Sequence, residues 1–144
     1  MKNDPFFADT NLFLRYLTND IPVQSNAVEV LLRDAANGKR SLVTNSMVIA
    51  EIVWTLESYY SMSREEIQTR VLAILNTPGL EVTDDVILFQ AIIWYVEKNV
   101  DFIDAYNAAW MSSHDLTEIY SFDQKHFKRF PGITIHVPEE SPKR

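Results

Sequence analysis

The sequence predicts an α/β layer fold with a mostly parallel sheet of about four or five short strands and helices on both faces. Three observations support this. Short apolar runs alternate with longer segments of helical periodicity. The chain's 144 residues fit one compact domain, which at that size buries roughly 70% of its unfolded surface. No internal repeat or linker divides it, so we expect one domain over 1–137 and a flexible tail over 138–144.

The expected strands are short apolar runs next to turn-forming or capping residues. They lie at 5–8, 41–44, 80–82, 118–121 and 133–135. Helical segments separate most of these strands, and strands joined by helical crossovers run parallel to one another. Active sites in such sheets form at the carboxyl ends of the strands.

Capping residues mark where the expected helices begin. Thr10 and Ser46 are expected N-caps, Asp101 is another, and residues 63–66 (Ser-Arg-Glu-Glu) form a capping box. The segment 20–22 (Asp-Ile-Pro) is expected to interrupt the chain. The helices are expected to begin at or near Thr10, Val23, Ser46, Ser63, Asp84 and Phe102, followed by a short helical turn over 124–129.

The composition excludes several classes of protein. Without cysteine, neither a disulfide framework nor a thiolate zinc site can form. No apolar run approaches the ~18–20 residues of a membrane span, and the acidic N-terminus does not resemble a signal peptide. We therefore expect a cytoplasmic protein without membrane contact. The net charge of −7 opposes nucleic-acid binding, unless the acids converge on a site filled by divalent cations.

Four acids occupy positions that suit such a site. Asp9 follows the first strand and Asp123 follows the fourth, while Asp104 and Glu51 lie early in two helices. If these helices begin at the same sheet edge, four carboxylates converge there and repel one another. Oxygen ligands of this kind suit Mg²⁺ or Mn²⁺, which can promote hydrolysis of a phosphodiester.

Each acid also has an ordinary structural explanation. Asp9 can cap a helix, Asp104 can interact favourably with a helix dipole, and Asp123 can begin a turn. Glu51 can be a solvated surface group, although its neighbours in the helix are apolar. If all four explanations held, the four acids would occupy positions suited to a shared site only by coincidence. The three histidines show no ligand spacing and are expected to be structural or exposed.

Four segments, in order, resemble the motifs of PIN-domain nucleases. Residues 8–17 resemble the opening D-T-N-x-x-L motif, and residues 48–56 resemble the segment in which a glutamate lies in an apolar helix. Residues 101–109 resemble D-F-x-D-A-x-x-A-A. Residues 121–127 resemble T-F-D-x-x-F, with Ser121 in place of the usual threonine. The chain's length makes it most similar to the VapC-type toxins of prokaryotic toxin–antitoxin pairs.

The resemblance implies a three-layer PIN-like fold and an Mg²⁺- or Mn²⁺-dependent endoribonuclease that acts on structured RNA such as tRNA. It also implies a homodimer and a cognate antitoxin protein. By motif, Asp9 and Asp104 would be the principal metal ligands, and Glu51 and Asp123 would complete the site directly or through water. The expected supporting residues are Thr10 and Asn11, which would hold the Asp9 loop by hydrogen bonds, together with Asp101 and Ser121.

Two other functions remain open from the sequence. One is a catalytically inactive module that kept the fold and binds RNA or protein. The other is an aspartate-based phosphotransfer protein, which often has a second aspartate close to its nucleophile. Asp9-Thr10-Asn11 lacks an aspartate two residues after the first.

Overall fold

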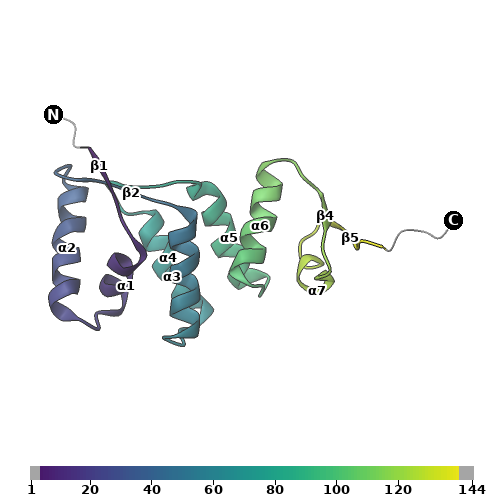
Figure 1. Ribbon diagram of the computed structural model, residues 1–144, viewed down its shortest axis with the longest axis horizontal. Helices are drawn as coiled ribbons and strands as arrows, with labels where there is room; N and C mark the ends of the chain where they lie inside the picture. The colour runs from purple at the N-terminus through teal and green to yellow at the C-terminus, as the bar shows by residue number, and fades with distance from the viewer. Residues whose placement is uncertain (1–3, 140–144) are drawn as a thin grey trace.

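The computed structural model describes residues 4–139, in which strands are interspersed with helices (Figure 1). The strands are β1 (Pro5–Phe7), β2 (Ser41–Thr44), β3 (Leu80–Val82), β4 (Glu118–Tyr120) and β5 (Thr134–His136). The helices are α1 (Thr10–Thr18), α2 (Pro22–Ala36), α3 (Ser46–Ser58), α4 (Arg64–Leu75), α5 (Asp85–Glu97), α6 (Phe102–Ser113) and α7 (Gln124–Phe127). The α/β class is confirmed. Residues 140–144 of the expected tail lie outside the described residues.

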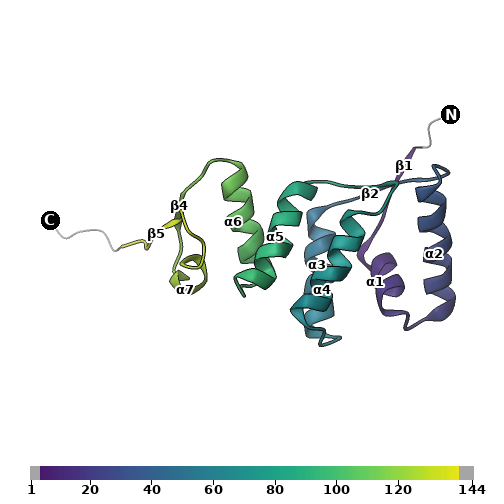
Figure 2. The ribbon, with the colours of Figure 1, turned by 180° about the vertical axis from the view of Figure 1, so that it is seen from behind.

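The strand pairings among residues 4–139 are all parallel, as predicted. β2 lies between β1 and β3, whereas β4 pairs only with β5. The five strands thus form two sheets, a difference from the single central sheet expected. Figures 1 and 2 show the reason: α5 and α6 lie between the sheets, which are toward opposite ends of the long axis.

The hydrophobic core lies largely among α3, α4 and α5. Its fully buried side chains include Ile52, Leu56, Ile67, Val71, Leu88 and Ile92. Burying a side chain of this size contributes about 1.5–3 kcal/mol, so these contacts are a major source of stability. No helix among residues 4–139 combines the length and apolar character needed to cross a membrane.

Two helices begin one residue away from where the sequence suggested. Asp9, not Thr10, is the extended N-cap of α1, and Asn45, not Ser46, is the N-cap of α3. The Asn45 side chain accepts a hydrogen bond from the backbone N–H of Val48 at 3.1 Å. Asp9 and Thr10 are both good N-cap residues, and so are Asn45 and Ser46. The local sequence therefore does not decide which residue of each pair is the cap.

The expected break at Asp20-Ile21-Pro22 is confirmed, because α1 ends at Thr18 and α2 begins only at Pro22. Pro22 is the first residue of α2. This position tolerates proline because a backbone N–H there would have no partner within the helix. The capping box is confirmed at its first contact, since the Ser63 hydroxyl accepts a hydrogen bond from the Glu66 backbone N–H at 3.2 Å. Asp101 is the N-cap of α6 as predicted, although its side chain makes no capping hydrogen bond.

Gly79 allows the start of β3 to approach the end of α2 closely. Its φ of +81° lies in the left-handed region, and a Cβ atom there would lie 2.2 Å from the Ala35 carbonyl oxygen. The Gly79 carbonyl accepts a hydrogen bond from the Leu42 backbone N–H. Glycine is therefore required both for its backbone conformation and for the space that it leaves.

We predict that Gly79→Ala lowers the free energy of unfolding by about 3 kcal/mol or more, because left-handed strain adds to a backbone clash. Gly38→Ala is the matched control: Gly38 has a φ of +79°, but an added Cβ would meet no atom within 4 Å. Its cost should be only about 1–2 kcal/mol. Urea unfolding followed by circular dichroism measures both, and equal losses would contradict the close approach.

Candidate metal centre

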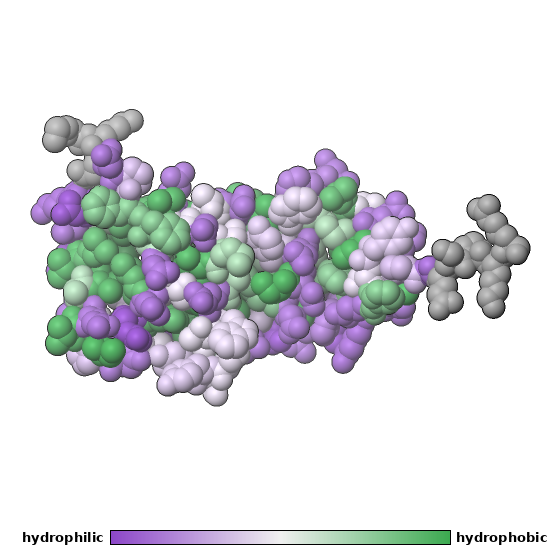
Figure 3. Space-filling view, in the orientation of Figure 1, coloured by the Kyte–Doolittle hydropathy of each residue, from purple (hydrophilic) through white to green (hydrophobic). Residues whose placement is uncertain are grey.

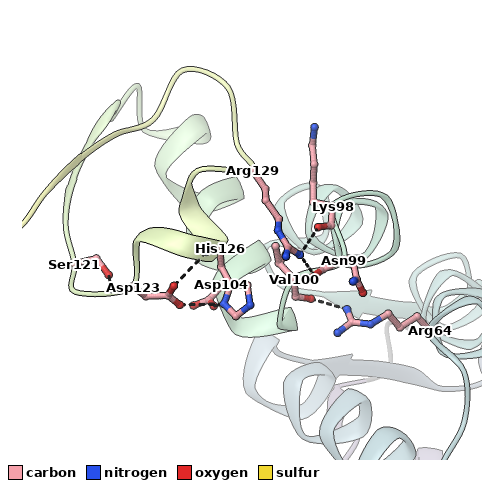
Figure 4. Close-up of polar contacts among 9 residues, drawn as sticks. All are labelled: Arg64, Lys98, Asn99, Val100, Asp104, Ser121, Asp123, His126 and Arg129. Atoms are coloured by element: carbon pink, nitrogen blue, oxygen red, sulfur yellow. Dashed lines mark hydrogen bonds and ion pairs between the residues drawn. The ribbon is translucent and has the colours of Figure 1, made fainter.

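The candidate centre lies where α6 begins and α7 follows β4 (Figure 4). Asp101 is the N-cap of α6, and Asp104 lies in its first turn. His126 lies on α7. Asp101, Asp104 and His126 each offer one ligand atom, and these three atoms lie within 4.8 Å of one another. The fold therefore brings two carboxylates and an imidazole together from two helices.

His126 links two of the predicted acids. Its Nδ1 atom lies 3.0 Å from an Asp123 carboxylate oxygen and 3.4 Å from an Asp104 carboxylate oxygen (Figure 4). The His126 backbone N–H also donates to the Asp123 carboxylate, at 3.2 Å. Ser121 accepts a hydrogen bond from the Asp123 backbone N–H at 2.9 Å, through the hydroxyl that serine shares with threonine. These contacts fix the loop between β4 and α7.

His126 was not among the residues expected at the site. The spacing of the histidines alone gives no sign of it, whereas Asp123-x-x-His126 across a helix start does. Asp123 is the N-cap of α7, and the capping bond turns its carboxylate toward the first turn, where His126 lies. A capping acid followed three residues later by histidine is therefore the pattern that indicated this contact.

The environment shifts the pKa values of Asp104 and Asp123 in opposite directions. Burial raises the pKa of the Asp104 carboxyl, and the negative charges of Asp123 and Asp101 raise it further. The hydrogen bond from the His126 backbone N–H lowers the pKa of Asp123 below its ordinary value. Asp104 thus carries negative charge that its surroundings do not fully compensate, which a nearby cation would relieve.

Two arginines hold the turn that leads into this centre. Arg64 on α4 donates to the carbonyl oxygens of Tyr95 and Val100, at 2.8 and 2.6 Å. Arg129 donates to the carbonyl oxygens of Lys98, at 3.1 Å, and of Asn99 (Figure 4). The turn between α5 and α6 is therefore fixed from both sides, which positions Asp101 and Asp104.

A cavity of about 340 Å³ opens beside the cluster, between α3 and the start of α6. Trp54 and Glu57 of α3 line it, together with Asp101 and Asp104. Glu57 accepts a hydrogen bond from the Tyr95 hydroxyl. Burial raises the pKa of Tyr95, and the hydrogen bond with Glu57 raises it further. Solvent and small ligands can therefore reach the carboxylates of α6.

Asp9 and Glu51 are not part of this cluster in the described residues. Asp9 is exposed at the end of β1, and the loop around it is held by the Thr44 hydroxyl, which donates to the Ala8 carbonyl at 2.8 Å. Within residues 4–139, no hydrogen bond is found from the side chains of Thr10 or Asn11 to Asp9. Glu51 lies on the exposed side of α3, while its apolar neighbours face the core.

A parallel α/β fold with carboxylates gathered at a helix start defines a candidate metal-dependent hydrolase. Residues 6–133 match the PIN domain family, which covers most of the chain. The chain therefore belongs to the PIN domain family, and the family resemblance drawn from the four motifs is confirmed.

Three individual proteins are similar to this chain. The VapC ribonuclease of Aquifex aeolicus (strain VF5) is 26% identical over 133 residues, which cover 92% of this chain and 97% of that protein. The crystal structure of VapBC2 from Rickettsia felis, bound to a promoter DNA fragment, matches with 16% identity and a TM-score of 0.38, covering 94% of this chain and all of that one. VapC20 of Mycobacterium tuberculosis, a sarcin–ricin loop cleaving toxin, matches with 19% identity and a TM-score of 0.39, covering 87% of this chain and 94% of that one.

We predict that Asp104→Asn raises the unfolding temperature of the protein in EDTA at pH 7. The folded-state pKa of Asp104 is raised, so its charged form costs stability at neutral pH, and asparagine removes that charge. The gain should shrink as the pH falls from the raised folded-state pKa of Asp104 toward the ordinary aspartate pKa of about 3.9, below which the carboxyl is protonated in both states. Differential scanning fluorimetry measures it, with the exposed Asp4→Asn as control.

A lower unfolding temperature for Asp104→Asn at pH 7 would contradict this prediction. It would mean that the contact between Asp104 and His126, at 3.4 Å, stabilises the fold more than the repulsion destabilises it.

Proposed function

We propose that this chain is a metal-dependent endoribonuclease that hydrolyses RNA phosphodiester bonds and acts as the toxin of a prokaryotic type II toxin–antitoxin module. The observation that carries the proposal is the cluster of Asp101, Asp104, Asp123 and His126 in a chain of the PIN domain family. The similarity to a curated VapC ribonuclease supports it, because the match extends over nearly the full length of both proteins.

The donor set fits a divalent cation. Asp101, Asp104 and His126 would hold it, because their ligand atoms lie close enough to share one ion. Asp9, the first acid of the family motif, is proposed as a further ligand, and Asp123 and Glu51 would complete the site directly or through water. Carboxylate oxygens suit Mg²⁺ and Mn²⁺, and the imidazole nitrogen makes the softer Mn²⁺ the more useful probe. Such an ion would lower the pKa of a water molecule, so that the water can act as the nucleophile. It would also neutralise negative charge on the phosphodiester.

The protein's own residues would prepare the site for that chemistry. The hydrogen bond to Asp123 keeps its carboxylate charged and holds the His126 ring in place. Asp104 is only partly exposed, which excludes some of the water that would otherwise screen its charge. The adjacent cavity gives a phosphodiester a route to these groups from the α3 side.

The acidic surface agrees with this function only if cations occupy the site. A net charge of −7 repels RNA at long range, and a bound divalent ion would reverse the local field where the carboxylates gather. The proposal also includes a structured RNA such as tRNA as substrate, a cognate antitoxin, a homodimer and a cytoplasmic location.

The proposal predicts cation-dependent RNA cleavage that requires the acids. Purified protein supplied with Mn²⁺ or Mg²⁺ should cleave tRNA, and EDTA should abolish the cleavage. Asp104→Asn, within the cluster, and Asp9→Asn, at the first acid of the family motif, should each reduce the rate by at least about 100-fold while circular dichroism remains unchanged. Asp85→Asn, an exposed acid elsewhere in the chain, should leave the rate unaltered.

Gel analysis of labelled RNA measures the cleavage. Full activity of either site variant with added metal would show that the substituted residue is not required for cleavage. RNA binding without cleavage at any metal concentration would favour the inactive binding module instead.

A further inference from the structure

A large aromatic side chain lies exposed beside the candidate metal centre. Trp54 on α3 is 68% exposed, although tryptophan is on average a highly buried residue. It lines the cavity of about 340 Å³ that also reaches Asp101 and Asp104. In Figure 3, the pale surface over the lower end of α3 adjoins the hydrophilic surface where α6 begins. An indole ring is therefore accessible next to the carboxylates that would hold the metal.

Glu57 is a neighbour of Trp54 and is held in place by a buried donor. It lies three residues further along α3 and lines the same cavity, and residues at this spacing share one side of a helix. Glu57 is exposed, but it accepts a hydrogen bond from the hydroxyl of the fully buried Tyr95. The Arg64 guanidinium lies 4.3 Å from the centroid of the Tyr95 ring. The carboxylate of Glu57 is thus fixed at the cavity wall.

The charged groups of the cavity are all hydrogen-bond acceptors. Among the described residues that line it, Glu57, Asp101 and Asp104 carry carboxylates, and none is a lysine or an arginine. Ionised carboxylates only accept hydrogen bonds, and they repel a phosphate. A matching ligand is therefore an uncharged flat ring with N–H groups along its edge. Unpaired RNA bases have this chemistry, and proteins bind them by aromatic stacking and by hydrogen bonds to their edges.

Guanine fits the fixed carboxylate better than the other bases do. Its Watson–Crick edge carries the N1–H donor next to the N2 amino group, so both donors can reach one carboxylate. Adenine and cytosine place an acceptor nitrogen beside their amino group, and uracil flanks its N–H with carbonyl oxygens. Each of these acceptors would face the lone pairs of Glu57, and a polar group left without a partner costs affinity.

We propose that the cavity between α3 and the start of α6 is a nucleobase subsite, in which Trp54 stacks on an unpaired guanine beside the scissile phosphate and Glu57 accepts hydrogen bonds from its Watson–Crick edge. The subsite deepens the proposed function and rests on it for the RNA substrate. Its volume of about 340 Å³ lies near the lower end of the 300–1,000 Å³ typical of small-ligand sites, which suits one base and not a duplex. Tyr95 is a positioning residue, because it acts through Glu57.

A binding measurement tests the subsite without relying on cleavage or on a metal. The chain contains three tryptophans, so its ¹H–¹⁵N spectrum contains three indole N–H signals. In EDTA, guanosine should shift the Trp54 signal, which Trp54→Phe identifies, and leave the Trp110 signal in place. Guanosine should bind about tenfold more tightly than adenosine, cytidine or uridine, because each of those loses a hydrogen bond to a charged acceptor.

Glu57→Gln separates the hydrogen bonds from the stacking. Glutamine keeps the shape and an oxygen for the Tyr95 hydroxyl, but it replaces the other acceptor oxygen by an amide donor. The affinity for guanosine should fall about tenfold, to that of the other nucleosides. Trp54→Phe keeps an aromatic ring and should retain the preference. Glu65→Gln, at an exposed acid of α4, is the matched control and should change nothing.

Cleavage locates the bound base relative to the scissile bond. Wild-type protein with Mg²⁺ is given RNA of random sequence, and the cut ends are sequenced. Guanosine should be enriched at one position beside the cut, and Glu57→Gln should remove the enrichment. Trp54→Ala should raise KM about tenfold with kcat nearly unchanged, because stacking holds the substrate and the transition state equally. Trp110→Ala, at an exposed tryptophan near the end of α6, should alter neither constant.

The outcomes separate the subsite from the ribonuclease function. Equal affinity for all four nucleosides, or a guanosine shift that spares the Trp54 signal, would overturn the subsite. Cleavage by wild-type protein without any guanosine bias at the cut ends would also overturn it, while the ribonuclease proposal would stand. Specific guanosine binding at Trp54 in a protein that cleaves no RNA with added metal would support the base subsite and reject the ribonuclease function.

Discussion

The turn between α5 and α6 is the constraint on which the rest of the structure depends. Arg64 and Arg129 donate to four backbone carbonyls around it, and such charge-assisted hydrogen bonds are stronger than those between neutral groups. The turn sets the direction of α6, and α6 carries both Asp101 and Asp104. It also determines where the β4–β5 unit lies relative to the three-stranded sheet.

That placement has an energetic consequence for the site. Gathering Asp101, Asp104 and Asp123 around one histidine leaves Asp104 with a raised pKa, because nearby negative charges add to the effect of burial. A folded protein tolerates such repulsion when a cation relieves it or when the function needs it. The same placement leaves β1 and β4 without a pairing between them. The separation of the strands into two sheets and the separation of Asp9 from Asp104 and Asp123 therefore have one cause.

Local patterns predicted the elements well and their long-range arrangement less well. Apolar runs predicted every strand, and the Ser63 capping box predicted α4, because these depend on neighbouring residues. Asp101, Asp104 and Asp123 meet because α6 and α7 begin near each other. The position of Asp9 relative to them depends on how α5 packs against α6, which no short motif encodes. His126 was missed because its contact follows from a cap, not from histidine spacing.

The central claim is that one cation site draws on both halves of the fold, including Asp9. Calorimetric titration with Mn²⁺ tests it most directly, in wild-type protein, Asp9→Asn and Asp104→Asn at equal chain concentration. Both substitutions should weaken Mn²⁺ binding by at least about tenfold. Wild-type affinity in Asp9→Asn, with loss only in Asp104→Asn, would show that Asp101, Asp104 and His126 form the site without the N-terminal half and would contradict the claim.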